Sequence, residues 1–257
     1  MSDLFDYTSK YYSKYRDKPP IELLARFKNH GLSSESCVLD VGTGTGQIPD
    51  FLKGSVKNIV GIDISTEMIE EAKRVVKADN IEFWILPAEE INEDLGKFDF
   101  ITFSASFHWM DKDRVLTKCK KVLNDNGKIV IMASASSWNS DEKWERAIVE
   151  TVQKYLGKER RAGKGTFAKD DRKFEDILED NEFTLIERDE IYTEKSRTFD
   201  KIVGLLYSTS YGNKSILGDK VDRFETELRE KLSDINQELV FRKTIKFEYM
   251  VFQLSEI

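Results

Sequence analysis

A short segment of the chain, Cys37 to Ile48, constrains the fold more strongly than any other. An apolar run from Cys37 to Val41, interrupted only by Asp40, leads into a loop with glycine at alternate positions, and apolar residues then return at helical spacing. The loop glycines are Gly42, Gly44 and Gly46. This order is typical of a buried strand, a tight loop and a helix. Glycine tolerates positive φ and lets a ligand lie against the backbone, so the segment predicts a nucleotide-sized site.

The spacing of these glycines separates two kinds of nucleotide site. A dinucleotide-binding loop reads G-x-G-x-x-G, whereas this loop reads G-x-G-x-G and follows an acid, Asp40. A carboxylate at that point repels a pyrophosphate but suits an ammonium or sulfonium cation. The segment Asp40–Gly46 resembles the first motif of class I S-adenosylmethionine-dependent methyltransferases, D-x-G-x-G-x-G. The resemblance implies that Asp40 and the three glycines bind S-adenosyl-L-methionine, with S-adenosyl-L-homocysteine as product.

The next two predicted strands supply further cofactor residues. The run Asn58–Asp63 ends in an acid that can accept hydrogen bonds from both ribose hydroxyls, a geometry that nicotinamide enzymes share. Ser65 then begins a helix, in which the resemblance places Met68 against the adenine, and we expect Ile64 to contact the cofactor as well. After the strand Ile81–Leu86, the family has Asp-Ala-Glu at the adenine edge. Pro87 replaces that aspartate here, and we expect Ala88 and Glu89 to line the site.

A fourth strand, Phe98–Ser104, ends beside a second group of candidate residues. In a doubly wound sheet the site lies where the strand order reverses, so Ser104 and the residues after it should lie beside the glycine loop. His108 is the histidine of this predicted crevice and a candidate general base, with Trp109 beside it as a substrate contact. The Ser-x-x-Phe-His-Trp sequence resembles methyltransferases of small molecules, a subgroup that includes trans-aconitate methyltransferases.

Two further segments carry the same subgroup resemblance. The aromatic stretch from Tyr11 to Pro20 resembles a Tyr-x-x-Tyr-Arg-Pro segment that folds over the cofactor, which implies that Tyr15 and Arg16 lie near its methionine end. A later Ser-x-Ser-Tyr stretch implies three substrate contacts in a lid, Ser208, Ser210 and Tyr211. We predict no metal ligands.

The order of strand and helix patterns predicts an α/β fold. Five strand–helix units in succession favour a doubly wound, Rossmann-like sheet of seven mostly parallel strands, with inserted lid helices. The final alternating segment, around Ile245–Val251, predicts an antiparallel last strand at or near the edge. We expect one domain over residues 1–257. It is divided into amino-terminal helices (1–30), a cofactor-binding core (31–135), a lid and substrate region with the sixth strand (136–235) and the final strand (236–257).

Composition limits the partners and the compartment. The net charge of −7 argues against nucleic acid unless a local patch binds it, such as the basic loop 158–173, whose role stays open. The two cysteines suit a reducing compartment, and we find no signal peptide or membrane span in the sequence. These features predict a cytoplasmic protein, monomer or homodimer, with a small-molecule substrate.

Together these features predict in-line transfer of a methyl group to a small carboxylate, hydroxyl or amine acceptor. Two alternatives remain at this stage. An NAD-dependent oxidoreductase shares the strand order and Asp63, although the glycine spacing and Asp40 count against it. A non-catalytic S-adenosylmethionine- or RNA-binding protein is the third possibility, because no residue here is an indispensable catalyst.

Overall fold

The computed structural model describes residues 7–134, 140–158, 161–162, 165–166 and 172–255. By its internal contacts the chain forms two compact units. The first, here called the sheet unit, comprises Lys18–Ser134, Lys169–Ile191 and Lys246–Ile257. The second, the helical unit, comprises Met1–Asp17, Ala135–Ala168 and Tyr192–Ile245. The predicted amino-terminal region 1–30 is therefore divided between the two units.

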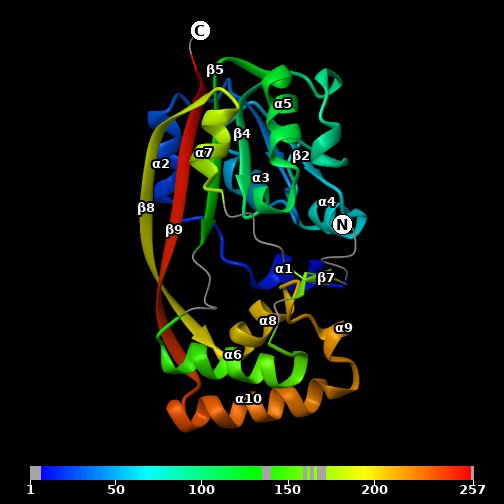
Figure 1. Ribbon diagram of the computed structural model, residues 1–257, viewed down its shortest axis with the longest axis vertical. Coiled ribbons are helices and arrows are strands. Elements are labelled where there is room, and N and C mark those ends of the chain that lie inside the picture. Colours follow the sequence, from blue (N-terminus) through cyan, green and yellow to red (C-terminus); the bar gives the residue numbers. More distant parts are fainter. Residues whose placement is uncertain (1–6, 135–139, 159–160, 163–164, 167–171, 256–257) are drawn as a thin grey trace. The chain divides into compact units, whose positions relative to one another are not determined.

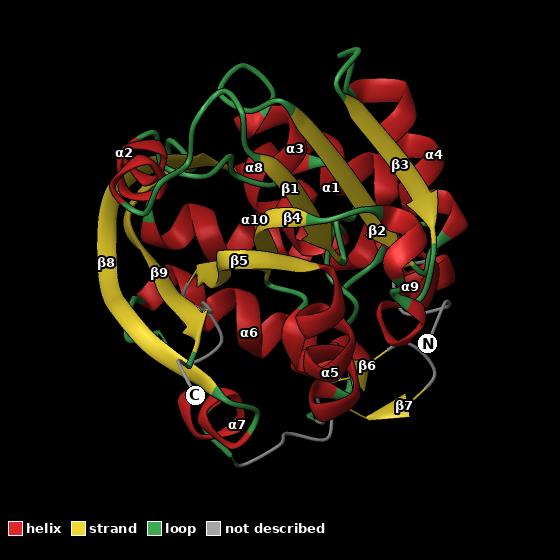
Figure 2. Ribbon diagram, turned by 90° about the horizontal axis from the view of Figure 1, so that it is seen from above, coloured by secondary structure: helices red, strands yellow, loops and turns green. Residues whose placement is uncertain are grey.

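A seven-stranded sheet dominates the sheet unit (Figures 1 and 2). Its order is β3-β2-β1-β4-β5-β9-β8. The strands are β1 (Cys37–Val41), β2 (Asn58–Asp63), β3 (Ile81–Ile85), β4 (Phe98–Ser104), β5 (Leu123–Ser134), β8 (Phe183–Thr198) and β9 (Val240–Leu254). Neighbours from β3 to β5 pair in parallel, and β9 pairs antiparallel with β5. The predicted Rossmann-like sheet, mostly parallel with an antiparallel last strand, is confirmed.

Helices cover both faces of this sheet (Figure 2). On one face, α5 (Lys112–Val122) and α7 (Phe174–Asp180) pack apolar side chains against β1, β4, β5 and β9. On the other face, α2 (Glu22–Asn29) and α3 (Gln47–Leu52) pack apolar side chains against the same four strands. The helix α4 (Thr66–Val75) packs against Phe83 of β3. Because both faces are buried, the central strands are nearly continuous apolar runs, as parallel sheets require.

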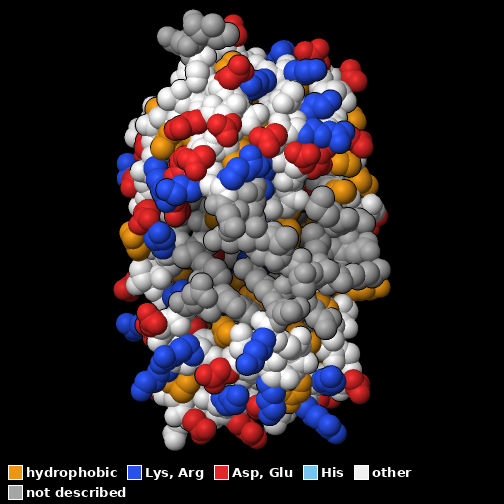
Figure 3. Space-filling view, viewed as in Figure 1, with side chains coloured by type: hydrophobic (Ala, Val, Ile, Leu, Met, Phe, Trp, Pro, Cys, Tyr) orange, Lys and Arg blue, Asp and Glu red, His pale blue; other side chains and the backbone are white. Residues whose placement is uncertain are grey.

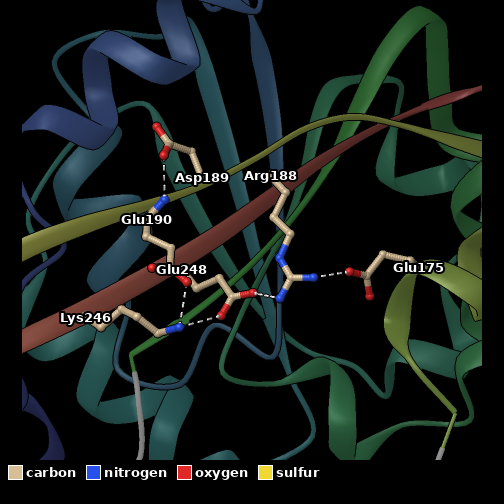
Figure 4. Close-up of polar contacts among 6 residues, drawn as sticks. All are labelled: Glu175, Arg188, Asp189, Glu190, Lys246 and Glu248. Carbon is tan, nitrogen blue, oxygen red and sulfur yellow. Dashed lines mark hydrogen bonds and ion pairs between the residues drawn. The ribbon is translucent and has the colours of Figure 1, made fainter.

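A cluster of charged side chains lies where β8, β9 and α7 meet (Figure 4). Arg188 of β8 forms ion pairs of 2.5 Å with Glu175 of α7 and with Glu248 of β9. Beside it, Lys246 of β9 forms an ion pair of 2.6 Å with Glu190 of β8. These five residues are here called the β8 charge cluster. The cluster follows the outermost strand of the sheet, where side chains meet water on one side.

The helical unit contains α1 (Ser9–Tyr15), α6 (Lys143–Leu156), α8 (Phe199–Tyr207), α9 (Lys214–Leu217) and α10 (Val221–Ile235). It also holds two short paired strands, β6 (Arg161–Ala162) and β7 (Gly165–Thr166), and the adjoining ends of β8 and β9. Within this unit α10 packs along α6, and α1 packs along α8 (Figure 1). Its apolar core includes Tyr207, Phe224 and Leu228 and is separate from the cores of the sheet unit.

Predicted and observed elements differ mainly at their ends. The fourth strand begins and ends as predicted, whereas the last strand, β9, begins at Val240 rather than near Ile245. The basic loop 158–173 lies largely outside the described residues. Among the residues that the structure describes, no helix combines the length and the apolar character needed to cross a membrane.

Candidate active site

The glycine loop follows β1 at the carboxyl edge of the sheet, and its amide groups are used within the protein. The N–H groups of Gly42 and Thr43 both donate to the carbonyl of Ile62, each at 2.9 Å, and that of Gly46 donates to Thr43 at 3.0 Å. The N–H of Gly44 donates to Asp63 Oδ2 at 2.9 Å. A loop that binds phosphate needs such groups free, so these four N–H groups are not available to a phosphate.

Glycine is required in this loop for conformation and for space. The φ angles of Gly42, Gly44 and Gly46 are 69°, 54° and 79°, in the left-handed region. A Cβ atom at Gly42 would lie 2.5 Å from the Cβ of Ser106, and one at Gly46 would lie 2.8 Å from Cζ of Phe83. The loop therefore packs directly against the segment after β4 and against β3.

Asp40 lies under the loop in the middle of the sheet, with its side chain 1% exposed. It is in register with Thr102 on β4, whose hydroxyl donates to Asp40 Oδ1 at 2.7 Å. Burial raises the pKa of the Asp40 carboxyl to about 6, although the hydrogen bond from Thr102 acts in the opposite direction. At neutral pH the group is mostly ionised, so a buried negative charge lies directly beneath the glycine loop.

Asp63, the last residue of β2, is half-buried, and both of its carboxylate oxygens accept backbone hydrogen bonds. Besides the N–H of Gly44, the carboxylate accepts the N–H of Ser65 at Oδ1, also at 2.9 Å. Burial raises the pKa of this carboxyl, and the backbone hydrogen bonds partly offset that effect. Each carboxylate oxygen has a second lone pair, so Asp63 can still accept from a ligand. Ile64 beside it exposes 41% of its surface, so its apolar side chain is accessible to a ligand.

The remaining predicted cofactor residues of the sheet unit fall into two environments. Met68 is buried in the first turn of α4, where its N–H is capped by the hydroxyl of Ser65 at 3.3 Å. Ala88 is also buried. Glu89 is partly exposed, and its Oε1 accepts the N–H of Asp111 at 3.0 Å, at the start of α5. Glu89 therefore also stabilises the turn that follows His108 and Trp109.

The segment after β4 lies close to the end of β1. It contains one residue with a strained backbone and one buried hydroxyl that bonds to β1. Ser104 ends the strand and is partly exposed. Ala105 has a φ of 52°, which few non-glycine residues adopt, and such outliers cluster at functional sites. Ser106 is buried and donates to the carbonyl of Val41 at 2.6 Å. The partly exposed rings of His108 and Trp109 follow, with centroids 4.7 Å apart.

The other five predicted residues belong to the helical unit. Tyr15 is buried, and its hydroxyl donates to Asp200 Oδ1 at 3.1 Å. Arg16 donates from Nη2 to the carbonyl of Ser208 at 3.3 Å, and its guanidinium lies 4.8 Å from the ring centroid of Tyr12. Thus the structure brings together two predicted residues that are far apart in sequence, Arg16 and Ser208.

The three predicted lid residues are mostly enclosed. Ser208 is fully buried, and its hydroxyl donates to the carbonyl of Leu205 at 2.6 Å, at the end of α8. Ser210 is also buried, whereas Tyr211 is partly exposed. Their contact with a substrate stays a prediction.

Sequence reasoning missed two residues that shape the site, Thr102 and Ser106. A signal for Thr102 was present, because it is the one polar residue inside the otherwise apolar part of β4 between Phe100 and Phe103. Its partner, Asp40, lies 62 positions away, so only the strand order brings them together. Ser106 carries no comparable signal.

S-adenosylmethionine, which the motif resemblance implies, fits the residues present. A nucleoside needs an acceptor for its ribose hydroxyls and an apolar surface for its base, and Asp63 and Ile64 supply these in adjacent positions. The hydroxyl of Thr45, in a residue 2% exposed, has no hydrogen-bond partner among the described residues, so the loop retains an unused polar atom. We infer from these donors and acceptors that the cofactor can be held here.

Comparison with known proteins agrees with this geometry. Residues 39–131 match the family model of a methyltransferase domain. A ubiquinone/menaquinone biosynthesis C-methyltransferase of Geobacter sp. (strain M21) is 40% identical over 114 residues, which are 41% of this chain and 48% of that protein. The chain spans about half the length of the curated relatives it matches.

Solved structures share the fold over nearly the whole chain. One described as a type II methyltransferase from Anaeromyxobacter dehalogenans covers 95% of this chain and 100% of its own, with a TM-score of 0.65 and 15% identity. A methyltransferase from Thiobacillus denitrificans, in complex with S-adenosyl-L-homocysteine, covers 95% and 96%, with a TM-score of 0.52 and 12% identity. The segment 39–131 is therefore similar to a methyltransferase domain, and the sheet around it has the fold of these solved structures.

Proposed function

We propose that this protein transfers a methyl group from S-adenosylmethionine to a small-molecule acceptor. The observation that carries the proposal is the hydrogen bonding of the glycine loop. The N–H groups of Gly42, Thr43, Gly44 and Gly46 are all used internally, and a buried carboxylate, Asp40, lies beneath them. This arrangement disfavours a pyrophosphate and favours the cationic amino-acid end of a sulfonium nucleoside.

In this proposal three residues of the sheet unit have defined roles in binding the cofactor. The cofactor, when bound, supplies a methyl group already activated by the positive sulfur. The carboxylate of Asp63 accepts from the ribose hydroxyls, and the exposed side chain of Ile64 packs on the base. Asp40 holds negative charge below the loop. The protein then has mainly to align the acceptor and exclude water, and alignment can contribute on the order of 7–11 kcal/mol.

His108 is the proposed proton acceptor. If the acceptor is a hydroxyl or an amine, the imidazole takes its proton as the new bond forms. If the acceptor is a carboxylate, no base is needed, and His108 and Trp109 only position it. The name of the Geobacter relative adds a further class, a quinone ring carbon, to these acceptors.

The cofactor is tested first, by titration calorimetry with S-adenosyl-L-homocysteine and, separately, with NAD. We expect binding of the first and none of the second. Binding of NAD alone would instead support the oxidoreductase alternative. Binding of S-adenosyl-L-homocysteine without methyl transfer to any compound of a metabolite extract would support a non-catalytic binding protein.

The acceptor is tested next, with radiolabelled methyl donor and four classes of compound. These are small tricarboxylates such as trans-aconitate, alcohols, amines and demethylated quinones. Labelling of trans-aconitate would support the small-acid subgroup to which Tyr15, Arg16, Ser208, Ser210 and Tyr211 point by resemblance. Labelling of the quinone alone would favour C-methylation and would count against Ser208, Ser210 and Tyr211 as contacts of a small acid.

The distribution of surface charge and the state of the two thiols bear on two further parts of the proposal, the kind of acceptor and the cellular compartment. On the face drawn in Figure 3, described basic and acidic side chains are interspersed, which supports a small-molecule acceptor over nucleic acid. Cys37 and Cys119 are both free thiols, which supports a reducing compartment such as the cytoplasm. A gel-shift assay with total RNA and a cell fractionation would test these two points.

A further inference from the structure

The chain leaves α1 through three consecutive residues, Tyr15, Arg16 and Asp17, here called the exit segment. The helix ends at Tyr15, and Arg16 has an extended backbone, with φ of −64° and ψ of 144°. Residues 16–21 form neither helix nor strand before α2 begins. Because no regular structure continues past Tyr15, contacts with other parts of the protein must fix the directions of Arg16 and Asp17.

The stretch from the end of β8 to the end of α8 provides these contacts. The hydroxyl of Tyr15 donates to Asp200 Oδ1 at 3.1 Å, and its carbonyl accepts a hydrogen bond from Nζ of Lys201. Arg16 donates from Nη2 to the carbonyl of Ser208 at 3.3 Å. All of these residues belong to the helical unit, so one part of this unit supports the exit segment.

Asp17, the last residue of the exit segment, is held by two cations. Arg197 lies next to the last residue of β8 and is 5% exposed. Its guanidinium donates to both carboxylate oxygens of Asp17, from Nη1 to Oδ1 at 3.1 Å and from Nη2 to Oδ2. Nζ of Lys201 lies 3.4 Å from Oδ1 of the same carboxylate. Two parallel hydrogen bonds from one guanidinium set direction as well as distance, so Arg197 fixes where the exit segment passes.

Close packing fixes Tyr15 in addition to these polar contacts. Its side chain is buried, and its ring lies against the backbone of α8 at Gly204, where a Cβ atom would come within 2.3 Å of the ring. The ring, the hydroxyl and the carbonyl of Tyr15 therefore all have defined partners. Arg16 follows directly from this fixed position.

Arg16 keeps donors for a ligand. Among the described residues its one side-chain hydrogen bond is that to Ser208, and its buried Nε has no acceptor. Its guanidinium lies over the ring of Tyr12, 4.8 Å from the centroid. A guanidinium has several N–H groups arranged to suit a carboxylate, and the methionine end of the proposed cofactor carries a carboxylate. The direction of Arg16 therefore decides whether that contact can form.

We infer, on the basis of the proposed function, that Arg197 and Lys201 are positioning residues for the cofactor. They hold Asp17 and the carbonyl of Tyr15, and so keep Arg16 in the direction that meets the methionine end of S-adenosylmethionine. Neither cation contacts the cofactor in this inference, and both act through the exit segment. Loss of either should therefore weaken cofactor binding while the residues that touch the cofactor stay the same.

Titration calorimetry of the full chain with S-adenosyl-L-homocysteine tests this role before any acceptor is known. The variants remove cations, because loss of Asp17 would leave the buried Arg197 without a partner. Arg197→Gln leaves Lys201 beside Asp17, and we expect it to weaken binding by about tenfold. Arg197→Lys keeps the charge but not the paired hydrogen bonds, so its affinity should lie between that variant and the parent.

Another arginine of β8 supplies a matched control. Arg188 forms ion pairs with Glu175 and Glu248, which lie outside the exit segment. Arg188→Gln should therefore bind S-adenosyl-L-homocysteine as the parent does. Equal weakening by Arg188→Gln and Arg197→Gln would mean that any broken ion pair of this strand lowers the affinity, and it would overturn the positioning role.

A double variant distinguishes positioning from a purely structural role. Arg16→Gln should by itself weaken binding by about tenfold, because it removes the charged donor. If Arg197 acts through Arg16, adding Arg197→Gln to Arg16→Gln should cause little further loss. Effects that add in full would overturn the inference, because a general loss of structure weakens binding whether or not Arg16 is present.

A further variant, Lys201→Gln, guards against misfolding. The pair between Arg197 and Asp17 stays intact in it, and the side chain of Lys201 is partly exposed, so the fold should tolerate the change. It should weaken binding severalfold. Parent-like affinity in Lys201→Gln, Arg197→Gln or Arg16→Gln would overturn the inference and leave the proposed function standing. A parent protein that binds no S-adenosyl-L-homocysteine would overturn both.

Discussion

The carboxylate of Asp63 holds the backbone N–H of Gly44 at 2.9 Å, across 19 positions of sequence. This hydrogen bond ties the carboxyl end of β2 to the glycine loop after β1. The residue proposed to hold the ribose therefore also fixes the loop proposed to hold the amino-acid end of the cofactor. Changes at Asp63 should alter both contacts together.

We expect Asp63→Ala to weaken S-adenosyl-L-homocysteine binding by about ten- to a hundredfold, because ribose hydroxyls and the N–H of Gly44 all lose their acceptor. Asp63→Asn retains one acceptor and should fall between that variant and the parent. Calorimetry measures both. The exposed Asp79→Ala, on the connection to β3, is the control and should bind normally. Parent-like affinity in Asp63→Ala would remove the residue from the site.

Gly42→Ala should destabilise the protein by roughly 1–3 kcal/mol, because the new methyl group meets the Cβ of Ser106 and the backbone φ is positive. The urea midpoint measures this. Gly54→Ala is the matched control, since a Cβ there meets nothing within 4 Å. Cofactor affinity should fall in the first variant alone. Equal midpoints for the two variants would contradict the close packing of the loop.

The free energy of unfolding should depend on pH through the titration of Asp40. Its pKa is raised to about 6 from 3.8, so the folded state binds more protons than the unfolded state between about pH 4 and 6. Stability attributable to this group therefore falls as pH rises through that range. Asp40→Asn removes this dependence and should exceed the parent by on the order of 2–3 kcal/mol at pH 7. Urea unfolding at several pH values measures the difference, and parallel curves would refute it.

The variant His108→Asn should show whether His108 acts as a general base or only positions the acceptor. If His108 takes a proton, the parent's kcat/KM should titrate as a histidine does, and that of the variant should not depend on pH over the same range. The variant's kcat should also fall by roughly a hundredfold or more. Identical pH profiles would end the base hypothesis and leave His108 as a positioning residue.

The two thiols should differ sharply in reactivity. Burial raises the pKa of Cys119 to about 12, and this residue lies on the buried face of α5. Cys37 is partly exposed, and burial raises its pKa as well. In the folded protein we expect a thiol reagent to modify Cys37 slowly and Cys119 only after unfolding in urea. Rapid labelling of Cys119 in native buffer would mean that the core opens readily.

The order of strands could be predicted because strand, loop and helix patterns repeat with little ambiguity from Cys37 to Ser104. The residues at which strands begin and end were harder to predict. Asn124 and Gly127 are residue types common in turns, yet they lie within β5, where the pairing with β4 shifts register between Phe98 and Phe100. Only tertiary pairing decides such a position, because the local sequence still favours a turn.

The residues at the site also divide into those that the local sequence indicates and those that only the strand order brings together. The places of Asp40 and Asp63 in the fold were predictable because each ends or interrupts a buried strand beside a loop. Their partners were not, since the hydrogen bonds from Thr102 and Gly44 depend on strand order. The hydrogen bond from the Ser208 hydroxyl to the carbonyl of Leu205 could not be predicted from the sequence either, and the substrate contact of Ser208 stays a prediction.

The outermost strand of the sheet also bears on how the molecules behave in concentrated solution. An unpaired strand edge can recruit a strand from another chain and so start aggregation. Along β8, the side chains of Arg188 and Glu190 are held by partners in the β8 charge cluster. A second chain that approached this edge would have to strip water from these charges. We therefore expect the cluster to disfavour strand pairing at this edge, although each of its exposed ion pairs adds little to folding stability.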